Sequence, residues 1–228
     1  MSNDPYPELK SFVEKYNTVL SKAQSTAIFV RGVEFQQEQV KELDNLLIDI
    51  ELKKKVAINK KNNTESNHLL CLELTTNAVK YELLMLINLK EDKPDNAWKA
   101  LINAQREIVL AIRNHPINGD YLNGYAHKLY LYEITLFPKM HFASRGCVVS
   151  KSICSICDEP IDCCEHIKGY AYMGQVCCEI IQKIESIDEI SLVENPADKL
   201  CRIVSLYENG KSIDIFTHRE IKKEKDYC

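Results

Sequence analysis

The chain has 228 residues, which is enough for one large domain or two small ones. Hydrophobic residues make up 45% of it and charged residues 27%, so most of the chain is expected to fold rather than remain disordered. The formal net charge of −4 argues against a protein built mainly to coat nucleic acid. No apolar run approaches the roughly 18 residues of a membrane span, and the N-terminus lacks a secretory signal pattern. We therefore expect a cytoplasmic protein without membrane contact.

The first 142 residues are predicted to form a helical bundle. Apolar residues recur there at the three- and four-residue intervals that place them on one face of a helix. Five segments show this pattern, namely residues 9–23, 34–58, 68–90, 94–114 and 121–137. The third segment is apolar on nearly all sides, which is typical of a central helix that its neighbours cover. The polar stretch 60–67 is predicted to be a turn.

Residues 143–217 have a different character, and we expect a small α+β module there. Nine of the ten cysteines lie in the part of the chain that begins at Cys147, and this part also holds more acidic than basic residues. A charged tail, residues 218–228, follows the module. The predicted fold class is therefore α+β, mainly α, with an N-terminal bundle and a C-terminal module.

Within the module, two segments have the composition of strands. They are residues 189–194 and 202–216, whereas residues 146–150 are expected to be only a short connector. The dipeptide Asn209-Gly210 lies inside the second segment. Because both central positions of a type I′ turn need positive φ, this dipeptide predicts a β-hairpin.

A cluster of cysteine and histidine predicts a metal site. Cys154 and Cys157 have C-x2-C spacing, which lets a tight turn direct two thiolates at one ion. Cys164 and His166 follow, so that three thiolates and one imidazole form a complete tetrahedral set for zinc. Cys163 is next to Cys164 and is an alternative ligand on the sequence alone.

Two other interpretations of the cysteines compete with a structural zinc site. Reduced cysteines can pack as small hydrophobic residues, but the segment is too acidic for a cysteine-lined core. A catalytic zinc normally has three protein ligands and an open position, whereas four ligands are available here. Cys177 and Cys178 are adjacent and can hardly both bind one ion without strain. We expect one of them to be buried and the other to contribute only to packing. A second metal site with Cys147 or Cys201 is a further alternative.

The metal-binding segment resembles a known type of module. Its string C-x2-C-x6-C-x-H-x2-G-x2-Y-x-G is filled by Cys154, Cys157, Cys164, His166, Gly169, Tyr172 and Gly174. This string is similar to a compact Cys3His zinc module of bacterial and phage-borne proteins, in which a segment of the type E-[IV]-S-L-V-x-x-P-A often follows. Residues 189–197 match that segment, and the resemblance covers about residues 144–205. It implies a zinc-bearing accessory part of a larger assembly, in a mobile-element or phage-defence setting.

Basic residues offer a second interpretation, in which the chain is an accessory subunit that binds nucleic acid. The candidate phosphate contacts lie at the end of the second predicted helix and are Lys53, Lys54, Lys55, Lys60 and Lys61. A solvated helix end is the simpler explanation for them. Arg113 and His115 are likewise expected to be the cationic last turn of the fourth helix.

The sequence contains no signature of a hydrolase, kinase or dinucleotide-binding enzyme. We therefore expect a non-enzymatic adaptor or regulatory subunit with structural zinc and no catalytic residues. Its expected partner is a larger protein that is catalytic or driven by ATP. A zinc-dependent hydrolase is the third and least favoured interpretation.

Overall fold

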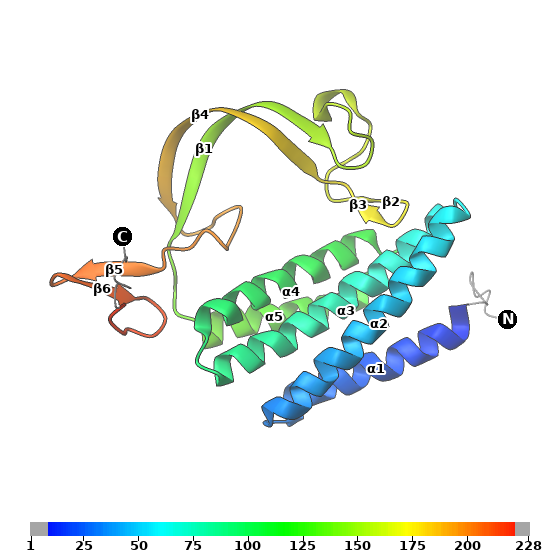
Figure 1. Cartoon of the computed structure of the whole chain (residues 1–228), viewed down its shortest axis with the longest axis horizontal. Coiled ribbons are helices and arrows are strands. Elements are labelled where there is room, and N and C mark those ends of the chain that lie inside the picture. The colour runs from blue at the N-terminus through cyan, green and yellow to red at the C-terminus, as the bar shows by residue number, and fades with distance from the viewer. Residues whose placement is uncertain (1–8, 222–228) are drawn as a thin grey trace, which may run out of the picture.

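The computed structural model describes residues 9–221 and shows a helical bundle from which a curved β-ribbon arises (Figure 1). The helices are α1 (Lys10–Phe29), α2 (Val33–Asn59), α3 (Asn63–Lys90), α4 (Pro94–Asn114) and α5 (Asn123–Leu136), with a short turn, η2 (Asp120–Leu122), before α5. Strands follow from Phe142 onward, so the predicted α+β, mainly α fold class is confirmed. Among the described helices, none is long and apolar enough to cross a lipid bilayer.

Helix α3 is the centre of the bundle, as its apolar composition predicts. It packs mainly against α2 and α4 and buries more side chains than any other described helix. It begins at Asn63, earlier than predicted, because Asn62 caps it. The Asn62 side chain accepts a hydrogen bond from the Glu65 N–H and donates one to the Glu65 carboxylate. Most of the turn predicted at 60–67 is therefore helical.

A buried carboxylate joins α3 to α5. Glu82 is fully buried and accepts hydrogen bonds from the hydroxyls of Tyr125, at 2.6 Å, and Tyr132, at 3.2 Å. Lys128 forms an ion pair with the same carboxylate at 2.8 Å. Two hydroxyls and an ammonium group thus compensate for the desolvation of the charge. The helical pattern alone does not mark this glutamate as buried.

The long ribbon consists of β1 (Phe142–Cys154) paired antiparallel with β4 (Glu179–Val193). Figure 1 shows it rising from the end of the bundle where α4 begins and arching over the bundle toward the opposite end. Four irregularities interrupt the register, and such bulges bend and twist a strand. The prediction of a connector at 146–150 and a strand only at 189–194 was wrong, since both regions belong to much longer strands.

Two short hairpins complete the described structure. Their strands are β2 (Ala171–Tyr172) with β3 (Gln175–Val176), and β5 (Ser205–Glu208) with β6 (Lys211–Asp214). Asn209 and Gly210 connect β5 to β6 with φ values of 50° and 81°. The hairpin predicted from the Asn-Gly dipeptide is confirmed.

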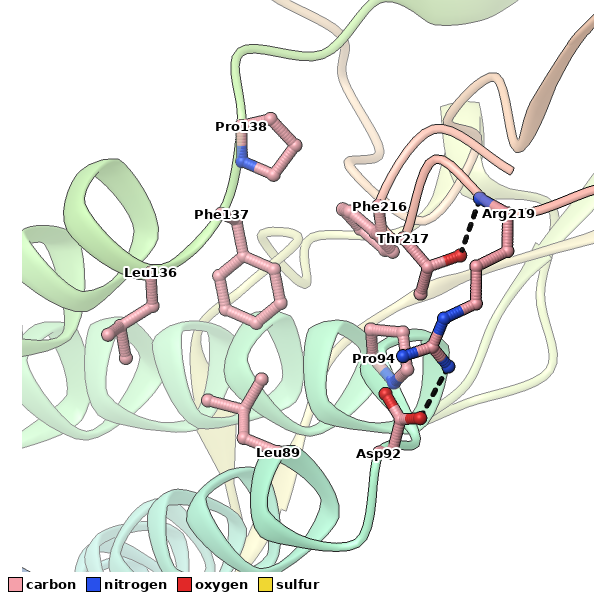
Figure 2. A pocket seen from close by; sticks show the side chains of 9 residues that line it. All are labelled: Leu89, Asp92, Pro94, Leu136, Phe137, Pro138, Phe216, Thr217 and Arg219. Carbon is pink, nitrogen blue, oxygen red and sulfur yellow. Dashed lines mark hydrogen bonds and ion pairs between the residues drawn. The ribbon is translucent and has the colours of Figure 1, made fainter. Parts of the chain in front are cut away.

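The segment after β6 closes a small pocket at the end of the bundle (Figure 2). Phe216 faces Phe137 with ring centroids 5.5 Å apart, and the pocket beside them has a volume of about 290 Å³. Arg219 reaches from this segment to Asp92, and its backbone N–H donates a hydrogen bond to the Thr217 hydroxyl. The first residues of the predicted charged tail, 218–228, are thus attached to the bundle. Residues 222–228 lie outside the described residues.

Trp98 fixes the base of the ribbon to the bundle. Its buried indole N–H donates a hydrogen bond to the Lys199 carbonyl oxygen at 2.9 Å. Its ring lies against Phe137, Phe142 and Phe216, with centroids 5.2, 6.4 and 6.2 Å away. The hydrophobic core of the bundle therefore continues into the first residue of β1.

Candidate metal centre

The far end of β1 forms the first half of a candidate metal centre. Strand β1 ends at Cys154, and the chain then turns back at Asp158, whose φ is 59° and whose N–H donates to the Cys154 carbonyl at 2.9 Å. Inside this turn the Ile156 N–H donates to the Cys154 sulfur, 3.4 Å away. The turn brings Cys157 beside Cys154, which is what the C-x2-C spacing predicts.

Cys164 and His166 supply the second half. They follow a short turn, η3 (Ile161–Cys163), that begins after Pro160. The three sulfur atoms and one ring nitrogen of the cluster all lie within 4.8 Å of one another. These four side chains, which we call the Cys3His cluster, could hold one metal ion. The cluster contains the half-buried Cys164 and not its exposed neighbour Cys163.

The His166 ring is oriented by Tyr172 of β2. The two rings meet edge to face with centroids 4.6 Å apart, and the Tyr172 hydroxyl accepts a hydrogen bond from the Ile167 N–H at 2.9 Å. Nδ1 of His166 is buried and makes no hydrogen bond to any residue of the described range. A buried ring nitrogen without a partner loses its hydration without compensation, and ligation of a metal would provide that compensation.

The local electrostatics favour the thiolate form of Cys154. Burial raises the pKa of its thiol. Hydrogen bonds from the backbone N–H groups of Ile156 and Cys157, together with those from the Cys177 and Cys164 side chains, outweigh this effect and lower the pKa to about 6. Burial raises the pKa of the Cys164 thiol, and the neighbouring Cys154 adds to the increase. Since metals bind thiolates rather than thiols, a lowered pKa of Cys154 favours metal binding by this side chain.

The remaining cysteines of the module lie outside the cluster. Cys177 is buried with its sulfur 3.7 Å from that of Cys154, and burial raises the pKa of its thiol to about 11. The two sulfur atoms are close enough for a weak S–H···S hydrogen bond. Cys178 is exposed, as are Cys147 and Cys201. Within residues 9–221 the Cys3His cluster is the only group of three or more potential metal ligands that converge.

Three asparagines of the bundle hold residues 154–178, the segment with the Cys3His cluster that we call the metal module, in place. Asn63 of α3 accepts a hydrogen bond from the Met173 N–H at 2.8 Å. Asn114, at the end of α4, donates to the Gly169 carbonyl at 3.0 Å and accepts from the Ala171 N–H at 2.7 Å. Asn67 of α3 donates to the Ala171 carbonyl at 3.2 Å and accepts from the Gly174 N–H at 2.8 Å. The ribbon is thus tied to the bundle at both ends, and Figure 1 shows β2 and β3 beside the helix ends.

Two glycines allow this close approach. Gly169 and Gly174 have φ values of 85° and 76°, which residues other than glycine rarely adopt. A Cβ at Gly174 would lie 3.1 Å from the Lys54 side chain, and one at Gly169 would overlap the Arg113 guanidinium. Both glycines belong to the string on which the resemblance to Cys3His modules depends, and here they let the module backbone contact the helices.

Replacing Asn114 by alanine is expected to loosen the metal module without unfolding the helices. The substitution removes two hydrogen bonds to the module, which together contribute about 2 kcal/mol. Amide hydrogen exchange of residues 169–176 should therefore accelerate roughly 30-fold, while the amides of α3 keep their rates. Asn96→Ala, at an exposed position of the same helix, is the control. Equal exchange in both variants would contradict the assigned role.

The predicted nucleic-acid contacts lie at the end of α2 and in the turn after it. These residues are Lys53, Lys54, Lys55, Lys60 and Lys61. Lys54 and Lys55 form ion pairs with neighbouring glutamates, and the Lys53 ammonium lies 4.9 Å from the centre of an aromatic ring. Lys60 and Lys61 occupy the turn before α3. Three of the five cations are therefore already engaged within the chain.

Arg113 and His115 have structural contacts at the end of α4. Nδ1 of His115 accepts a hydrogen bond from the Asn118 N–H at 3.1 Å, and its Nε2 lies 3.2 Å from the Tyr121 hydroxyl. The Arg113 guanidinium lies 6.0 Å from the centre of the Tyr170 ring. These two residues order the loop after α4 and its contact with the metal module.

Comparisons with known proteins add no relative. No protein-family model matches this chain, no curated protein matches its sequence, and no solved structure matches its coordinates.

Proposed function

We propose that the Cys3His cluster binds one Zn²⁺ ion. Three thiolates and an imidazole are ligands that zinc prefers, whereas magnesium and calcium prefer oxygen. The observation that carries this proposal is the convergence of the four side chains, together with the buried and unpartnered Nδ1 of His166. The ion would connect the end of β1 to the segment after η3. Metal binding would supply folding free energy where few large apolar side chains are available.

We propose a structural role for this ion. Four protein ligands complete the tetrahedral coordination of zinc and leave no position for a reacting water. A hydrolytic zinc needs such an open position and a general base beside it. The zinc-dependent hydrolase is therefore the least supported of the three functions.

For the whole chain, we propose the function of a non-enzymatic adaptor or regulatory subunit. Helix α2 supports this, because Ile48, Leu52 and Val56 recur at four-residue intervals and are each more than half exposed. Such an apolar stripe is typical of a helix that packs against a partner protein. From the resemblance of its metal module, we propose that the partner is a larger catalytic or ATP-driven bacterial protein of mobile-element or phage-defence context.

Replacing Leu52 by glutamate is expected to abolish capture of that partner. A charge in the middle of the α2 stripe would have to be desolvated in the complex, while the free chain tolerates it on an exposed surface. The measurement is affinity capture followed by mass spectrometry. The cells used carry the genes that lie next to the gene of this chain. Gln37→Glu introduces the same charge on α2 about 22 Å away and should retain the partner. Equal capture by both variants would contradict the assignment of the stripe.

Nucleic-acid binding is the alternative function, and it has its own test. Lys60 and Lys61 are the least engaged members of the lysine group. If this alternative were correct, affinity for DNA or RNA would fall steeply with salt, and Lys60→Ala would weaken binding and lower the salt dependence. We expect neither effect, since the ion pairs of Lys54 and Lys55 already neutralise part of the charge. Filter binding of the wild type and the Lys60→Ala variant at two salt concentrations measures the affinity for nucleic acid and its salt dependence.

A further inference from the structure

Strand β4 contains a three-residue repeat. Residues 181–192 read Ile-Gln-Lys, Ile-Glu-Ser, Ile-Asp-Glu and Ile-Ser-Leu. The register with β1 leaves Gln182, Glu185 and Asp188 without a partner residue, so each of the first three triplets contains one bulged residue. In a regular strand, side chains three residues apart point to opposite faces. The bulged residue in each triplet compensates for this and returns the next isoleucine to the same face of the strand. In agreement, one groove is lined by the first three isoleucines, Ile181, Ile184 and Ile187.

This isoleucine row and the edge of its strand are both uncovered. Ile184, Ile187 and Ile190 are 48%, 57% and 71% exposed. The ribbon has only two strands, and within the described part of the chain no backbone group of residues 180–193 forms a hydrogen bond outside the ladder with β1. Free strand edges pair readily with other strands, and two-stranded ribbons are marginally stable by themselves.

The isoleucine row is complementary to itself when it is read in the opposite direction. Consider two copies of β4 that run antiparallel, with a two-fold axis at the centre of residues 181–190. In this register Ile184 of one copy faces Ile187 of the other, and Ile181 faces Ile190. Directly opposite side chains lie on the same face of a sheet, so the two isoleucine rows would meet along their whole length.

The charges of β4 fit the same register. Lys183 of one copy would face Asp188 of the other, and the two-fold axis repeats this pair at the other end of the row. Within one chain, Lys183 lies opposite Lys151 of β1, and like charges in that position repel. No ion pair of the described residues involves Lys183 or Asp188. A second copy would supply the opposite charge that the ribbon itself lacks.

We infer that β4 is a dimerisation strand that pairs with β4 of a second copy of this chain. The two ribbons then form one four-stranded sheet in the order β1, β4, β4, β1. Closed two-fold symmetry is the commonest form of self-association, and the palindromic order of isoleucine and charge satisfies it with a single strand. The inference involves neither the metal nor the α2 stripe. Its test can therefore fail or succeed independently of the tests of the proposed function.

Charge reversal tests the pairing on the full-length chain. Lys183→Glu sets two carboxylates opposite each other at both ends of the row, and Asp188→Lys sets two ammonium groups opposite each other. Each single variant should dimerise at least roughly tenfold more weakly than the wild type. An equimolar mixture of the two variants regains both attractive pairs and should form a heterodimer. Sedimentation velocity gives the masses, while circular dichroism and zinc content show that the exposed substitutions leave the fold intact.

Three results would overturn the inference. The first is a wild-type chain that stays monomeric at every concentration, which would leave the row to a different partner. The second is self-association of both single variants with wild-type affinity. The third is a mixture of folded variants that fails to form the heterodimer.

Discussion

Replacing Cys154 by serine is expected to abolish zinc binding and to unfold the metal module while the helical bundle persists. Cys154 is fully buried and belongs to the Cys3His cluster, so its replacement by serine removes one of the three sulfur ligands of that cluster. Structural zinc sites in small peptides have apparent binding free energies of about 10–16 kcal/mol, most of which the module would lose. Elemental analysis and limited proteolysis measure the two effects.

Cys163→Ser is the matched control for this substitution. Cys163 precedes Cys164 and is exposed, so its replacement is expected to leave both zinc content and protease resistance unchanged. Loss of zinc in Cys163→Ser would show that the ligand is this cysteine and not its neighbour. Retention of zinc and protease resistance in Cys154→Ser would show that the proposed ligand set is wrong.

Replacing Trp98 by alanine is expected to lower the free energy of unfolding by about 3–5 kcal/mol. The indole is buried among three phenylalanine rings, and its N–H satisfies the carbonyl of Lys199. The substitution would leave a cavity where the bundle meets the base of the ribbon and would also leave that carbonyl without its donor. Urea unfolding followed by circular dichroism measures the change.

Phe29→Ala is the control for the loss of a large aromatic side chain. Phe29 is 80% exposed, and substitutions of exposed residues usually change the free energy of unfolding by less than about 0.5 kcal/mol. Similar stabilities of the two variants would contradict the view that one continuous core joins the bundle to the ribbon.

The convergence of the four side chains in the Cys3His cluster was predictable because their placement is local. The C-x2-C turn brings Cys154 and Cys157 together, and Cys164 and His166 follow within a few residues. The choice between Cys163 and Cys164 was not predictable, because it depends on how η3 turns the chain toward the cluster. The hairpin at Asn209-Gly210 was predictable for the same reason, since the turn is encoded in two adjacent residues.

The ribbon was not predictable from the usual strand pattern. A half-buried strand alternates with a period of two, whereas the isoleucines of β4 recur every three residues because a bulged residue lies between them. Contacts between residues far apart in the sequence were not predictable either. The hydrogen bond between Trp98 and Lys199 joins residues 101 positions apart, and the Glu82 network depends on which face of α5 meets α3. Such contacts depend on the packing of helices, which a single sequence does not specify.

The metal content of the purified full-length chain tests the central claim most directly. If the Cys3His cluster holds a structural ion, elemental analysis will find one zinc per chain, and replacement by cobalt will produce the absorption bands of tetrahedral thiolate coordination. A well-folded chain that contains no metal, and that takes up no cobalt, would contradict it.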